Sequence, residues 1–423
     1  MRYIADLHIH SKYSRATSSD MSPESIWKWA QLKGITVIGT GDFTHPEWFK
    51  ELRKKLEPSG NGLLRLKDAY QGKDIPGSCS ADVFFMLTAE ISCIYSRKGK
   101  TRKVHCLVFA PDGSVAGNIN TALSKIGNLS SDGRPILGLD AKELLKIVLD
   151  SSPDVILIPA HAWTPHFSVF GSESGFDSLE ECFDELTPHI HAIETGLSSD
   201  PAMNRRLSAL DRITLISNSD AHSAAKIGRE ANMFDTDVSY LSIVNALRTR
   251  KGLLGTIEFF PEEGKYHYDG HRACNVRLSP RETRGRNYLC PVCGKKLTIG
   301  VMHRVEKLAD RENGALAPGA LPFRSVIPLQ EILAEALEVG VSSKKVEREH
   351  LSLLAQLGNE FTVLLDAPLN DIQRAGSPRI SEAIGRMRAG QVHIEPGYDG
   401  AYGTIAIFGE TEKKEIKGQM PLL

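Results

Sequence analysis

The stretch Ile4-Ala5-Asp6-Leu7-His8-Ile9-His10 opens the chain with an apolar strand that carries two imidazoles. Successive side chains of an extended strand point to opposite faces, so Asp6, His8 and His10 share one face. Neutral imidazole binds zinc or manganese, and two imidazoles on one face converge without any loop closure. The stretch therefore predicts one edge of a metal site; a short strand with incidental polar residues is the alternative.

Short apolar runs alternate with amphipathic segments from residue 4 to about residue 257. A helical pattern covers 22–33, where Ser22 suits the N-cap and Pro23 the first turn. Continuous apolar runs are typical of strands buried on both faces. Strands that alternate with helices predict a parallel sheet or a β/α barrel. The expected strands are 36–39, 83–87, 104–109, 155–158, 191–194 and 214–217.

Bulk properties restrict the class of protein. The 423 residues suggest two or three domains, and 51 Lys and Arg against 52 Asp and Glu exclude a uniformly basic nucleic-acid coat. No run approaches 18 apolar residues and no apolar leader with a cleavage site is evident, so we expect a cytoplasmic protein without a membrane partner. Four of the seven cysteines are scattered, which indicates reduced thiols.

We expect three domains and a tail. Residues 260–311 contain too few aliphatic side chains for a core of their own and need a stabilising cross-link such as a bound metal. Beyond them, 327–339, 346–357 and 380–388 look helical, and 392–394 and 404–408 look like strands. The predicted boundaries are 1–259 for the barrel, 260–311 for a small zinc-binding basic domain, 312–408 for a mainly helical domain and 409–423 for a flexible tail.

Residue types that ligate metals recur near the ends of the expected strands. In β/α barrels the carboxyl ends of the strands converge on one mouth, so residues remote in sequence meet there. For any one of them alone a capping or surface role is the simpler interpretation, but together they predict one site. Mixed imidazoles and carboxylates suit Zn²⁺, Mn²⁺ or Fe²⁺ better than Mg²⁺ or Ca²⁺. The candidates are Asp42, Glu90, His105, His161, Asp220 and His222.

These motifs resemble those of the polymerase and histidinol phosphatase (PHP) superfamily of metal-dependent phosphoesterases. The resemblance covers about residues 1 to 257. It implies a distorted seven-stranded (β/α) barrel that holds two or three divalent metals (Zn, Mn or Mg), with catalytic roles for Asp220, His222 and Glu90. It is carried by His8-Ile9-His10, Glu90, His105, Pro159-Ala160-His161 and Asp220-Ala221-His222.

The sequence departs from that pattern at the third metal. Many relatives have a histidine soon after the first pair, where this chain has Ser14, and an Asp-His pair where it reads Gly41-Asp42-Phe43-Thr44-His45. Asp42 or His45 could replace the missing imidazole, and Asp42 is favoured because it lies nearer the strand end. His191 and Glu194 are further candidates, for which a supporting or strand-edge position is expected.

Adjacent divalent ions would clamp a phosphodiester, lower the pKa of a bound water and stabilise the leaving oxygen. No side-chain nucleophile is needed for this chemistry. The sequence has no Walker loop and no Gly-x-Ser-x-Gly elbow, which argues against nucleoside triphosphate hydrolysis and serine esterase chemistry.

A second metal motif lies in the 260–311 segment. His271 and Cys274 form one pair of spacing x₂, and Cys290 and Cys293 form another after fifteen intervening residues. Thiolates bind zinc tetrahedrally, so the three cysteines predict a structural zinc site that stabilises this small segment. His271 matches the ligand spacing, while His267 and His303 are the alternatives for the fourth ligand.

Two basic segments accompany these motifs. Residues 265–311 carry eleven Lys or Arg against four acids, net +7, and residues 97–103 carry five cations. Charge runs are often only solvated faces, but beside a phosphodiesterase site they favour nucleic acid as the partner.

The order of barrel, cysteine-bearing basic insert and helical region resembles the endonuclease Q family of the superfamily. This likeness spans nearly the whole chain and implies DNA cleavage on the 5′ side of deaminated bases (uracil, hypoxanthine, xanthine) and abasic sites, and therefore a cytoplasmic, nucleoid-associated protein. The supporting stretches are 39–46, 174–179, 300–306 and 396–403.

A duplex hides the edge of a base, so such an enzyme is expected to flip the target nucleotide. The loop 167–176 carries Gly171, Ser172, Ser174 and Gly175 among aromatic residues and could let backbone amides approach an extruded base. A flexible surface loop is the alternative interpretation. The terminal Gln419-Met420-Pro421-Leu422-Leu423 resembles peptides that dock on bacterial sliding clamps, and a tail without such a role is its alternative.

Two other functions compete with a lesion-specific endonuclease. A small-molecule phosphoesterase of histidinol-phosphatase type would use the same metals but has no need of the basic insert. A non-catalytic nucleic-acid-binding adaptor would need no metal ligands in the barrel.

Overall fold

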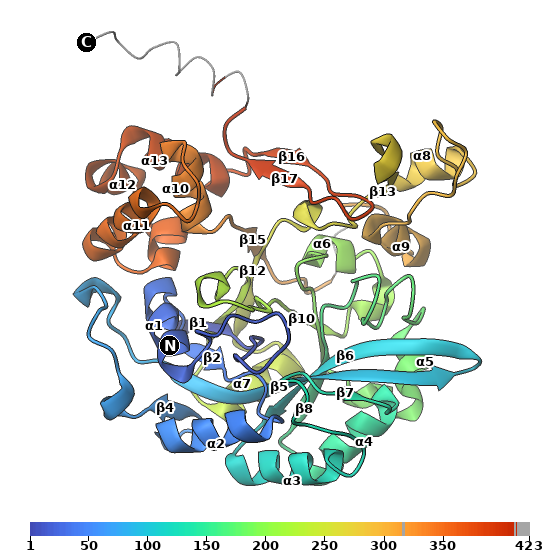
Figure 1. Ribbon diagram of the computed structural model, residues 1–423, viewed down its shortest axis with the longest axis horizontal. Coiled ribbons are helices and arrows are strands. Elements are labelled where there is room, and N and C mark those ends of the chain that lie inside the picture. The colour runs from blue at the N-terminus through green and yellow to red at the C-terminus, as the bar shows by residue number, and fades with distance from the viewer. Residues whose placement is uncertain (315–317, 410–411, 413–423) are drawn as a thin grey trace.

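The structure is a computed structural model and describes residues 1–314, 318–409 and 412 (Figure 1). It is a mixed α/β architecture in which helices surround one eleven-stranded sheet. The main path of the sheet is β15-β12-β11-β1-β2-β5-β4-β3, and β6, β7 and β8 join it through β5 and β6. These strands are β1 (Arg2–Asp6), β2 (Val37–Gly39), β3 (Leu56–Pro58), β4 (Leu64–Leu66), β5 (Phe84–Arg97), β6 (Lys100–Ala110), β7 (Ile136–Leu137), β8 (Ile156–Pro159), β11 (Ala231–Asp235), β12 (Leu253–Glu258) and β15 (Phe323–Ser325).

Seven strands of the first half follow one another by direct contact. β1 pairs in parallel with β2 and β2 with β5, whereas β6 is antiparallel to both β5 and β8. β9 (Ala192–Glu194) and β10 (Thr214–Ile216) form a separate parallel pair. The N–H of Ala162 donates to the carbonyl of Glu194 (2.9 Å), which joins the end of β8 to β9. A bridge between Ile9 and Ala221 then brings the chain after β10 back beside the chain after β1.

The interior of this array is apolar because alternate residues of each strand face it. Ala5 and Leu7 are fully buried in one cluster with Val37, Ile158 and Ile216. The residues between them point the other way, which places Asp6, His8 and His10 on a common face. The predicted strands at 36–39, 83–87, 104–109, 155–158, 191–194 and 214–217 are all confirmed within a few residues, although the second and third extend into a long hairpin.

Helices cover the sheet and begin where the sequence offers caps. The predicted helix at 22–33 is confirmed as α1, with the Ser22 side chain accepting from the N–H of Ser25 and Gly34 ending the helix at φ 88°. The helices of the first half are α1 (Pro23–Lys33), α2 (Pro46–Lys55), α3 (Gly113–Leu123), α4 (Ala141–Ser151), α5 (Leu179–Phe183), α6 (Pro201–Asn204) and α7 (Tyr240–Thr249).

The second half contains the predicted insert and the predicted helices. The insert holds β13 (Asp269–His271), β14 (Val276–Leu278), α8 (Pro280–Gly285) and α9 (Val301–Leu308). It is followed by α10 (Leu329–Leu337), α11 (Lys344–Leu357), α12 (Leu369–Ala375), α13 (Pro378–Arg388) and the hairpin β16 (His393–Glu395) with β17 (Thr404–Ala406). The predicted helices at 327–339, 346–357 and 380–388 and the two predicted strands are confirmed.

The three predicted domains interleave. β15, from the C-terminal segment, pairs in parallel with β12 of the large sheet. The segment that connects β16 to β17 lies on the insert, where the N–H of Tyr268 donates to the carbonyl of Gly397 (2.9 Å). One apolar core also runs from α1 into α10 and α11. Among the described residues, no helix combines the length and apolarity that a membrane span requires.

Candidate metal centre

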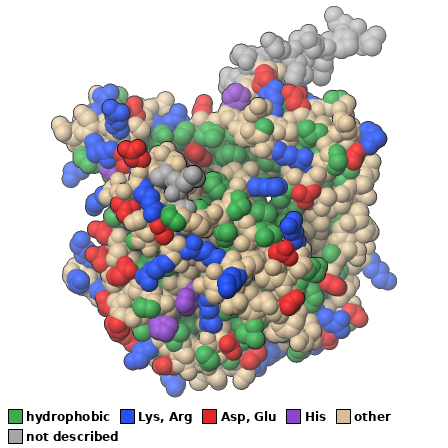
Figure 2. Space-filling model, turned by 180° about the vertical axis from the view of Figure 1, so that it is seen from behind, with side chains coloured by type: hydrophobic (Ala, Val, Ile, Leu, Met, Phe, Trp, Pro, Cys, Tyr) green, Lys and Arg blue, Asp and Glu red, His purple; other side chains and the backbone are tan. Residues whose placement is uncertain are grey.

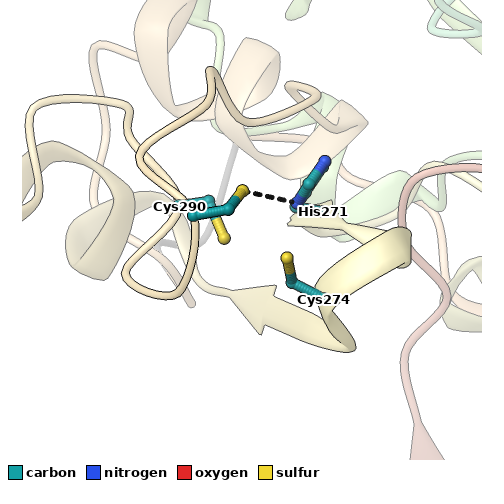
Figure 3. A group of neighbouring side chains, drawn as sticks. His271, Cys274 and Cys290 are labelled. Carbon is teal, nitrogen blue, oxygen red and sulfur yellow. Dashed lines mark hydrogen bonds between the residues drawn. The ribbon is translucent and has the colours of Figure 1, made fainter.

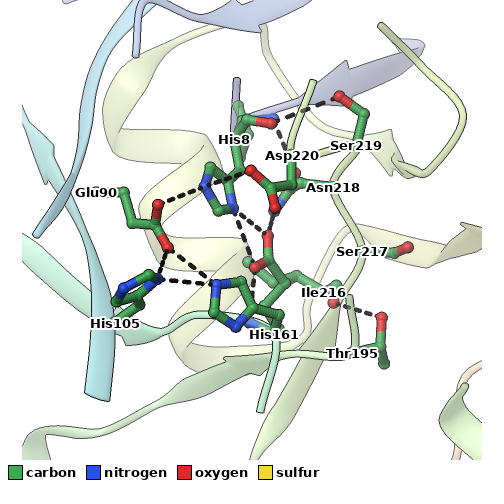
Figure 4. Close-up of polar contacts among 12 residues, drawn as sticks. His8, Glu90, His105, His161, Thr195, Ile216, Ser217, Asn218, Ser219 and Asp220 are labelled. Carbon is green, nitrogen blue, oxygen red and sulfur yellow. Dashed lines mark hydrogen bonds and ion pairs between the residues drawn. The ribbon is translucent and has the colours of Figure 1, made fainter. Parts of the chain in front are cut away.

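Two groups of ligand-type side chains meet at Glu90. The first consists of His8, His10, Glu90 and Asp220, and the second of Glu90, His105 and His161. Within each group one ligand atom per residue lies within 4.8 Å of all the others. Figure 4 shows Glu90 between His8 on one side and His105 and His161 on the other. The shared carboxylate makes the two groups neighbours.

The first group has the geometry of a cation site. His10 Nε2 lies 3.0 Å from Asp220 Oδ1 and 3.2 Å from Glu90 Oε2, and His8 Nε2 lies 3.6 Å from both of these oxygens. His8 Nε2, His10 Nε2 and Asp220 Oδ1 are nevertheless buried without a hydrogen-bond partner. Buried polar atoms left unpaired are costly, and a divalent cation would satisfy all three.

The second group brings two imidazole nitrogens onto one carboxylate oxygen. Glu90 Oε1 lies 2.7 Å from His105 Nδ1 and 3.0 Å from His161 Nε2, and the two nitrogens are 3.2 Å apart. Burial lowers the pKa of His105 to about 4, which favours the neutral, metal-binding imidazole. The residues present therefore fit a second divalent ion next to the first.

Backbone strain accompanies two of these ligands. His161 has φ 28° and Asp220 has φ 47°, a region that non-glycine residues rarely adopt. His161 lies two residues beyond β8 and Asp220 four residues beyond β10. The turns after these strands aim both side chains back toward Glu90.

Each histidine of the first group is held from behind by a carboxylate. His8 Nδ1 lies 3.1 Å from both oxygens of Glu194, which also accept hydrogen bonds from Asn218 Nδ2 (2.9 Å) and from the N–H of His161 (2.8 Å). This contact fixes the ring so that Nε2 faces the metal group. The expected supporting position of Glu194 is confirmed.

Asp42 holds His10 in the same way, so the structure places this predicted ligand behind His10 and outside the two ligand groups. Its Oδ1 lies 3.0 Å from His10 Nδ1. Its Oδ2 accepts from the N–H and Oγ of Ser11 (2.6 and 2.7 Å) and from Ser14 Oγ (2.9 Å). Both oxygens are therefore committed to orienting His10, and the carboxylate joins neither ligand group.

The other predicted histidines lie near the centre or away from it. His222 stacks beside His10 with ring centroids 4.4 Å apart, but its Nδ1 is hydrogen-bonded to the carbonyl of Asp220 and it joins neither group. His45 caps α2 by accepting from the N–H of Trp48. His191 lines a separate cavity of about 420 Å³ next to Arg248.

Sequence reasoning missed Arg134. Its Nη1 lies 3.0 Å from Glu90 Oε2. A single arginine in a loop, forty-four residues from its partner, carries no recognisable spacing. Only the three-dimensional structure brings this guanidinium to the ligand groups.

The loop 167–176 is ordered by contacts within itself and with its neighbours. The N–H of Gly175 donates to the carbonyl of Gly171 (3.0 Å), and that of Gly171 to the carbonyl of Ser168 (3.4 Å). Ser174 is buried, and its hydroxyl accepts from the N–H of Phe167 (3.3 Å). These groups are thus unavailable for an extruded base, whereas Ser172 is exposed.

The insert gathers its predicted zinc ligands. One ligand atom each of His271, Cys274, Cys290 and Cys293 lies within 4.8 Å of the others. Figure 3 shows His271 and Cys274, from the first spacing pair, opposite Cys290 from the second. Of the alternatives, His303 is bonded to Asp269 Oδ2 through its Nδ1 (2.6 Å). Three sulfurs and one imidazole fit tetrahedral zinc.

Surface charge is distributed unevenly. The face opposite to that of Figure 1 mixes acidic and basic side chains, and Lys and Arg gather across its middle (Figure 2). The net charge of the whole chain is −1, and basic side chains can still gather locally on such a surface.

Comparison with known proteins connects this geometry to a family. Residues 328–391 match the family model described as the MJ0043 C-terminal domain. Over 417 residues the chain is 30% identical to an uncharacterized protein, YqxK, of Bacillus subtilis, covering 95% of this chain and 98% of that protein. It is also 30% identical over 273 residues to the uncharacterized protein MJ0043 of Methanocaldococcus jannaschii, covering 62% of this chain and about a third of that longer protein (33%).

Two solved structures match over nearly the whole chain. One is the lesion-specific endonuclease PfuEndoQ from Pyrococcus furiosus, with a TM-score of 0.84 and 32% identity, covering 99% of this chain and 98% of that one. The other is endonuclease Q in complex with a 27-mer duplex that has an abasic lesion at the active site, with a TM-score of 0.82, 32% identity and 98% coverage of both chains.

Proposed function

This chain belongs to the endonuclease Q family, and we propose that it is a metal-dependent DNA-repair endonuclease that hydrolyses the phosphodiester 5′ to deaminated bases and abasic sites. The observation that carries the proposal is the double ligand group around Glu90, with three buried ligand atoms left unpaired. We also propose that the seven consecutive strands are the distorted barrel expected of the PHP superfamily.

The residues divide into those that would hold metal and those that would support them. His8, His10, Glu90 and Asp220 would hold one ion, and Glu90, His105 and His161 the other. Bound ions of this kind polarise a phosphodiester and generate hydroxide near neutral pH. Glu90 and Asp220 would supply the anionic ligand oxygens, while Glu194 and Asp42 orient the imidazole rings of His8 and His10. No side-chain nucleophile is required.

A cleavage assay tests this function. Labelled duplexes with uracil, hypoxanthine, an abasic site or only normal bases are incubated with the protein and Zn²⁺, Mn²⁺ or Mg²⁺. Lesion-specific nicking is expected. Phosphate release from small esters alone would favour a histidinol-phosphatase type of enzyme, and binding without cutting would favour an adaptor.

A matched pair of variants accompanies the assay. Asp220→Asn removes a ligand oxygen and should abolish nicking, whereas Asp235→Asn alters an exposed carboxylate at the far end of β11 that pairs with Arg2. Equal loss in both variants would contradict the assignment of the site.

We further propose that the protein recognises a lesion by flipping the target nucleotide out of the duplex. We assign the contact to the loop 167–176 through its exposed residue Ser172 rather than through its glycine amides. Gly175→Val is a poor test, since a Cβ at Gly175 would lie 2.4 Å from the backbone nitrogen of Gly171. Ser172→Ala should instead change the ratio of nicking at uracil to nicking at thymine. An unchanged ratio would show that this loop does not contact the base.

Recruitment to a sliding clamp is a separate proposal. It rests on Gln419-Met420-Pro421-Leu422-Leu423, which lies outside the described residues. Deletion of these five residues should abolish clamp binding in a pull-down while leaving nicking intact, and an intact chain that does not bind a clamp would refute it.

A further inference from the structure

Arg134 is the one Lys or Arg, among the described residues, whose side chain forms an ion pair with a carboxylate of the two ligand groups. Its Nη1 lies 3.0 Å from Glu90 Oε2, the same oxygen that lies 3.2 Å from His10 Nε2. The Glu90 side chain is fully buried, whereas that of Arg134 is 24% exposed. The guanidinium therefore stands between the buried ligands and solvent.

The turn that carries Arg134 is built against the ligand group. A Cβ on Gly133 would lie 2.3 Å from Asp42 Oδ2 and 2.4 Å from Ser14 Oγ, so a larger residue there would displace these two side chains. The N–H of Gly133 donates to the carbonyl of Tyr13 (3.0 Å). Asp132 accepts at Oδ1 from the backbone N–H of Arg134 (3.1 Å). These contacts fix the backbone of Arg134 against the residues that orient His10.

The contact with Glu90 leaves most of the guanidinium unused. Arginine has five N–H donors in a planar fork, and the described residues account for one of them, at Nη1. A fork of this kind suits both a carboxylate and a phosphate. A simple counter-ion for Glu90 would need neither the solvent-facing position nor the remaining donors.

We propose that Arg134 is a catalytic residue that donates to a non-bridging oxygen of the scissile phosphodiester while it keeps its bond to Glu90. This inference rests on the proposed function. Hydrolysis forms one bond between phosphorus and the water oxygen and breaks one ester bond, which yields a hydroxyl and a phosphate monoester. Arg134 exchanges no proton; it stabilises the charge that grows on the non-bridging oxygens.

Phosphorothioate substrates test the contact directly. Abasic duplexes with sulfur at either non-bridging position of the scissile phosphate are compared with the normal duplex, using wild type, Arg134→Gln and Arg134→Lys. Arg134→Gln should lower kcat about 10²- to 10³-fold on the normal duplex. With sulfur at one of the two non-bridging positions, the ratio of wild-type to variant kcat should be smaller by about tenfold or more. With sulfur at the other position, this ratio should equal the ratio on the normal duplex. Equal penalties on all three substrates would overturn the proposal.

Two controls exclude a merely structural role. Arg65→Gln breaks another arginine–glutamate pair, at 2.8 Å with Glu57 and remote from the ligands, and should leave kcat unchanged. The bound metal, measured by mass spectrometry, should be the same in Arg134→Gln as in wild type. Loss of metal in both Arg134 variants would mean that the guanidinium only holds Glu90, and would overturn the proposal.

A binding measurement adds a readout that needs no turnover. In the nicking-deficient Asp220→Asn background, with the zinc of the insert left in place, adding Arg134→Gln should lower the log-log salt slope of abasic-duplex binding by about 0.9, as for the loss of one phosphate contact. An unchanged slope would contradict the contact. If wild type nicks no lesion, the proposed function fails by itself; hydrolysis of bis(4-nitrophenyl) phosphate then tests Arg134, with the same loss of kcat expected.

Discussion

At the scale of single residues, two carboxylates lie behind the ligand groups rather than within them. Glu194 and Asp42 each face the Nδ1 of a histidine, which leaves Nε2 of His8 and His10 directed at Glu90 and Asp220. Supporting partners of this kind set the tautomer and the ring orientation of a ligand. Their loss should weaken metal binding without removing it.

Asp42→Asn tests this division of roles. The variant keeps an oxygen for His10 but places an amide where Ser11 and Ser14 donate, so the ring loses part of its support. We expect metal affinity to fall about 10- to 100-fold, with full occupancy recovered at high metal concentration. Isothermal titration with Zn²⁺ and Mn²⁺ measures the change.

Glu90→Gln provides the contrast for Asp42→Asn. Glu90 belongs to both ligand groups, so its variant should lose both ions at any practical concentration. If Asp42→Asn lost metal as completely as Glu90→Gln, Asp42 would be a ligand after all.

Residue spacing explains which parts of the site were predictable. Six residues lie within strands that the apolar pattern reveals or no more than four residues after them, and the structure brings all six together: His8, His10, Glu90, His105, His161 and Asp220. Asp42 follows a strand too, and the sequence does not distinguish a ligand from the group behind it. Arg134 lies in a loop whose path depends on the packing of Gly133, which no local pattern encodes.

At the scale of elements, residues 269–300 of the insert have only a small apolar cluster besides their cysteine cluster. Its own apolar cluster contains four buried side chains, Val276, Leu278, Cys290 and Leu297. Burial raises the pKa of the Cys290 thiol, but the N–H groups of Cys293 and Val292 outweigh it and lower that pKa to about 6. A thiolate is thus favoured near neutral pH, as zinc binding requires.

Metal removal should therefore unfold the insert and spare the large sheet. Cys290→Ser, or a chelator, is expected to abolish protection from hydrogen exchange across 269–300, while peptides of β5 and β6 keep theirs. Cys79→Ser changes a buried thiol outside the cluster and is the control. Equal protection of 269–300 with and without zinc would refute a structural metal.

A buried ion pair joins α1 to the C-terminal helices. Lys33 Nζ lies 2.8 Å from Glu360 Oε1, and His350 Nε2 lies 3.1 Å from Glu360 Oε2. Burial raises the pKa of Glu360, but Lys33 and His350 outweigh it and bring that pKa to about 2, below its ordinary 4.5. The pair therefore stabilises the fold above pH 4.5, and this stabilisation is lost as the pH falls from about 4.5 toward 2.

Glu360→Gln should remove this pH dependence and destabilise the protein by about 3 to 5 kcal/mol at pH 7, because it leaves Lys33 buried without its charge partner. Urea unfolding of wild type and variant at pH 7 and pH 3.5 measures both effects. The double variant Lys33→Met with Glu360→Leu should recover much of the loss. A variant as stable as wild type at pH 7 would show that the pair contributes nothing.

At the scale of the whole molecule, the order of segments along the chain is predictable and their interleaving is not. The composition of 260–311 and the helical periodicity beyond it are properties of the sequence. The return of β15 to the large sheet involves three residues, Phe323–Ser325, whose place is set by pairing with β12. Such short strands take their register from the tertiary structure, so no local signal announces them.

Arg304 links the insert to the loop that follows β8. It lies on α9 and is 7% exposed. Its Nε donates to the carbonyl of Phe170 and its Nη2 to that of Phe176 (both 2.8 Å), and Nη2 also pairs with Asp177 (2.7 Å). The same loop accepts, at the carbonyl of Phe167, the N–H of the candidate ligand His105 (2.9 Å). The insert is thereby connected through one loop to the metal centre.

Arg304→Gln should loosen this loop while the metal centre stays intact. Two carbonyls would lose charged donors, at about 1 to 3 kcal/mol each, so hydrogen exchange across 167–176 should rise. Bound metal should not change, whereas KM for lesion duplexes should increase, because the loop would no longer be held in its binding geometry. Arg281→Gln, an exposed arginine of α8, removes the same charge from the insert without a loop contact. If both variants raised KM equally, the insert would act through its charge alone; an effect confined to Arg304→Gln would mean that it acts by holding the loop.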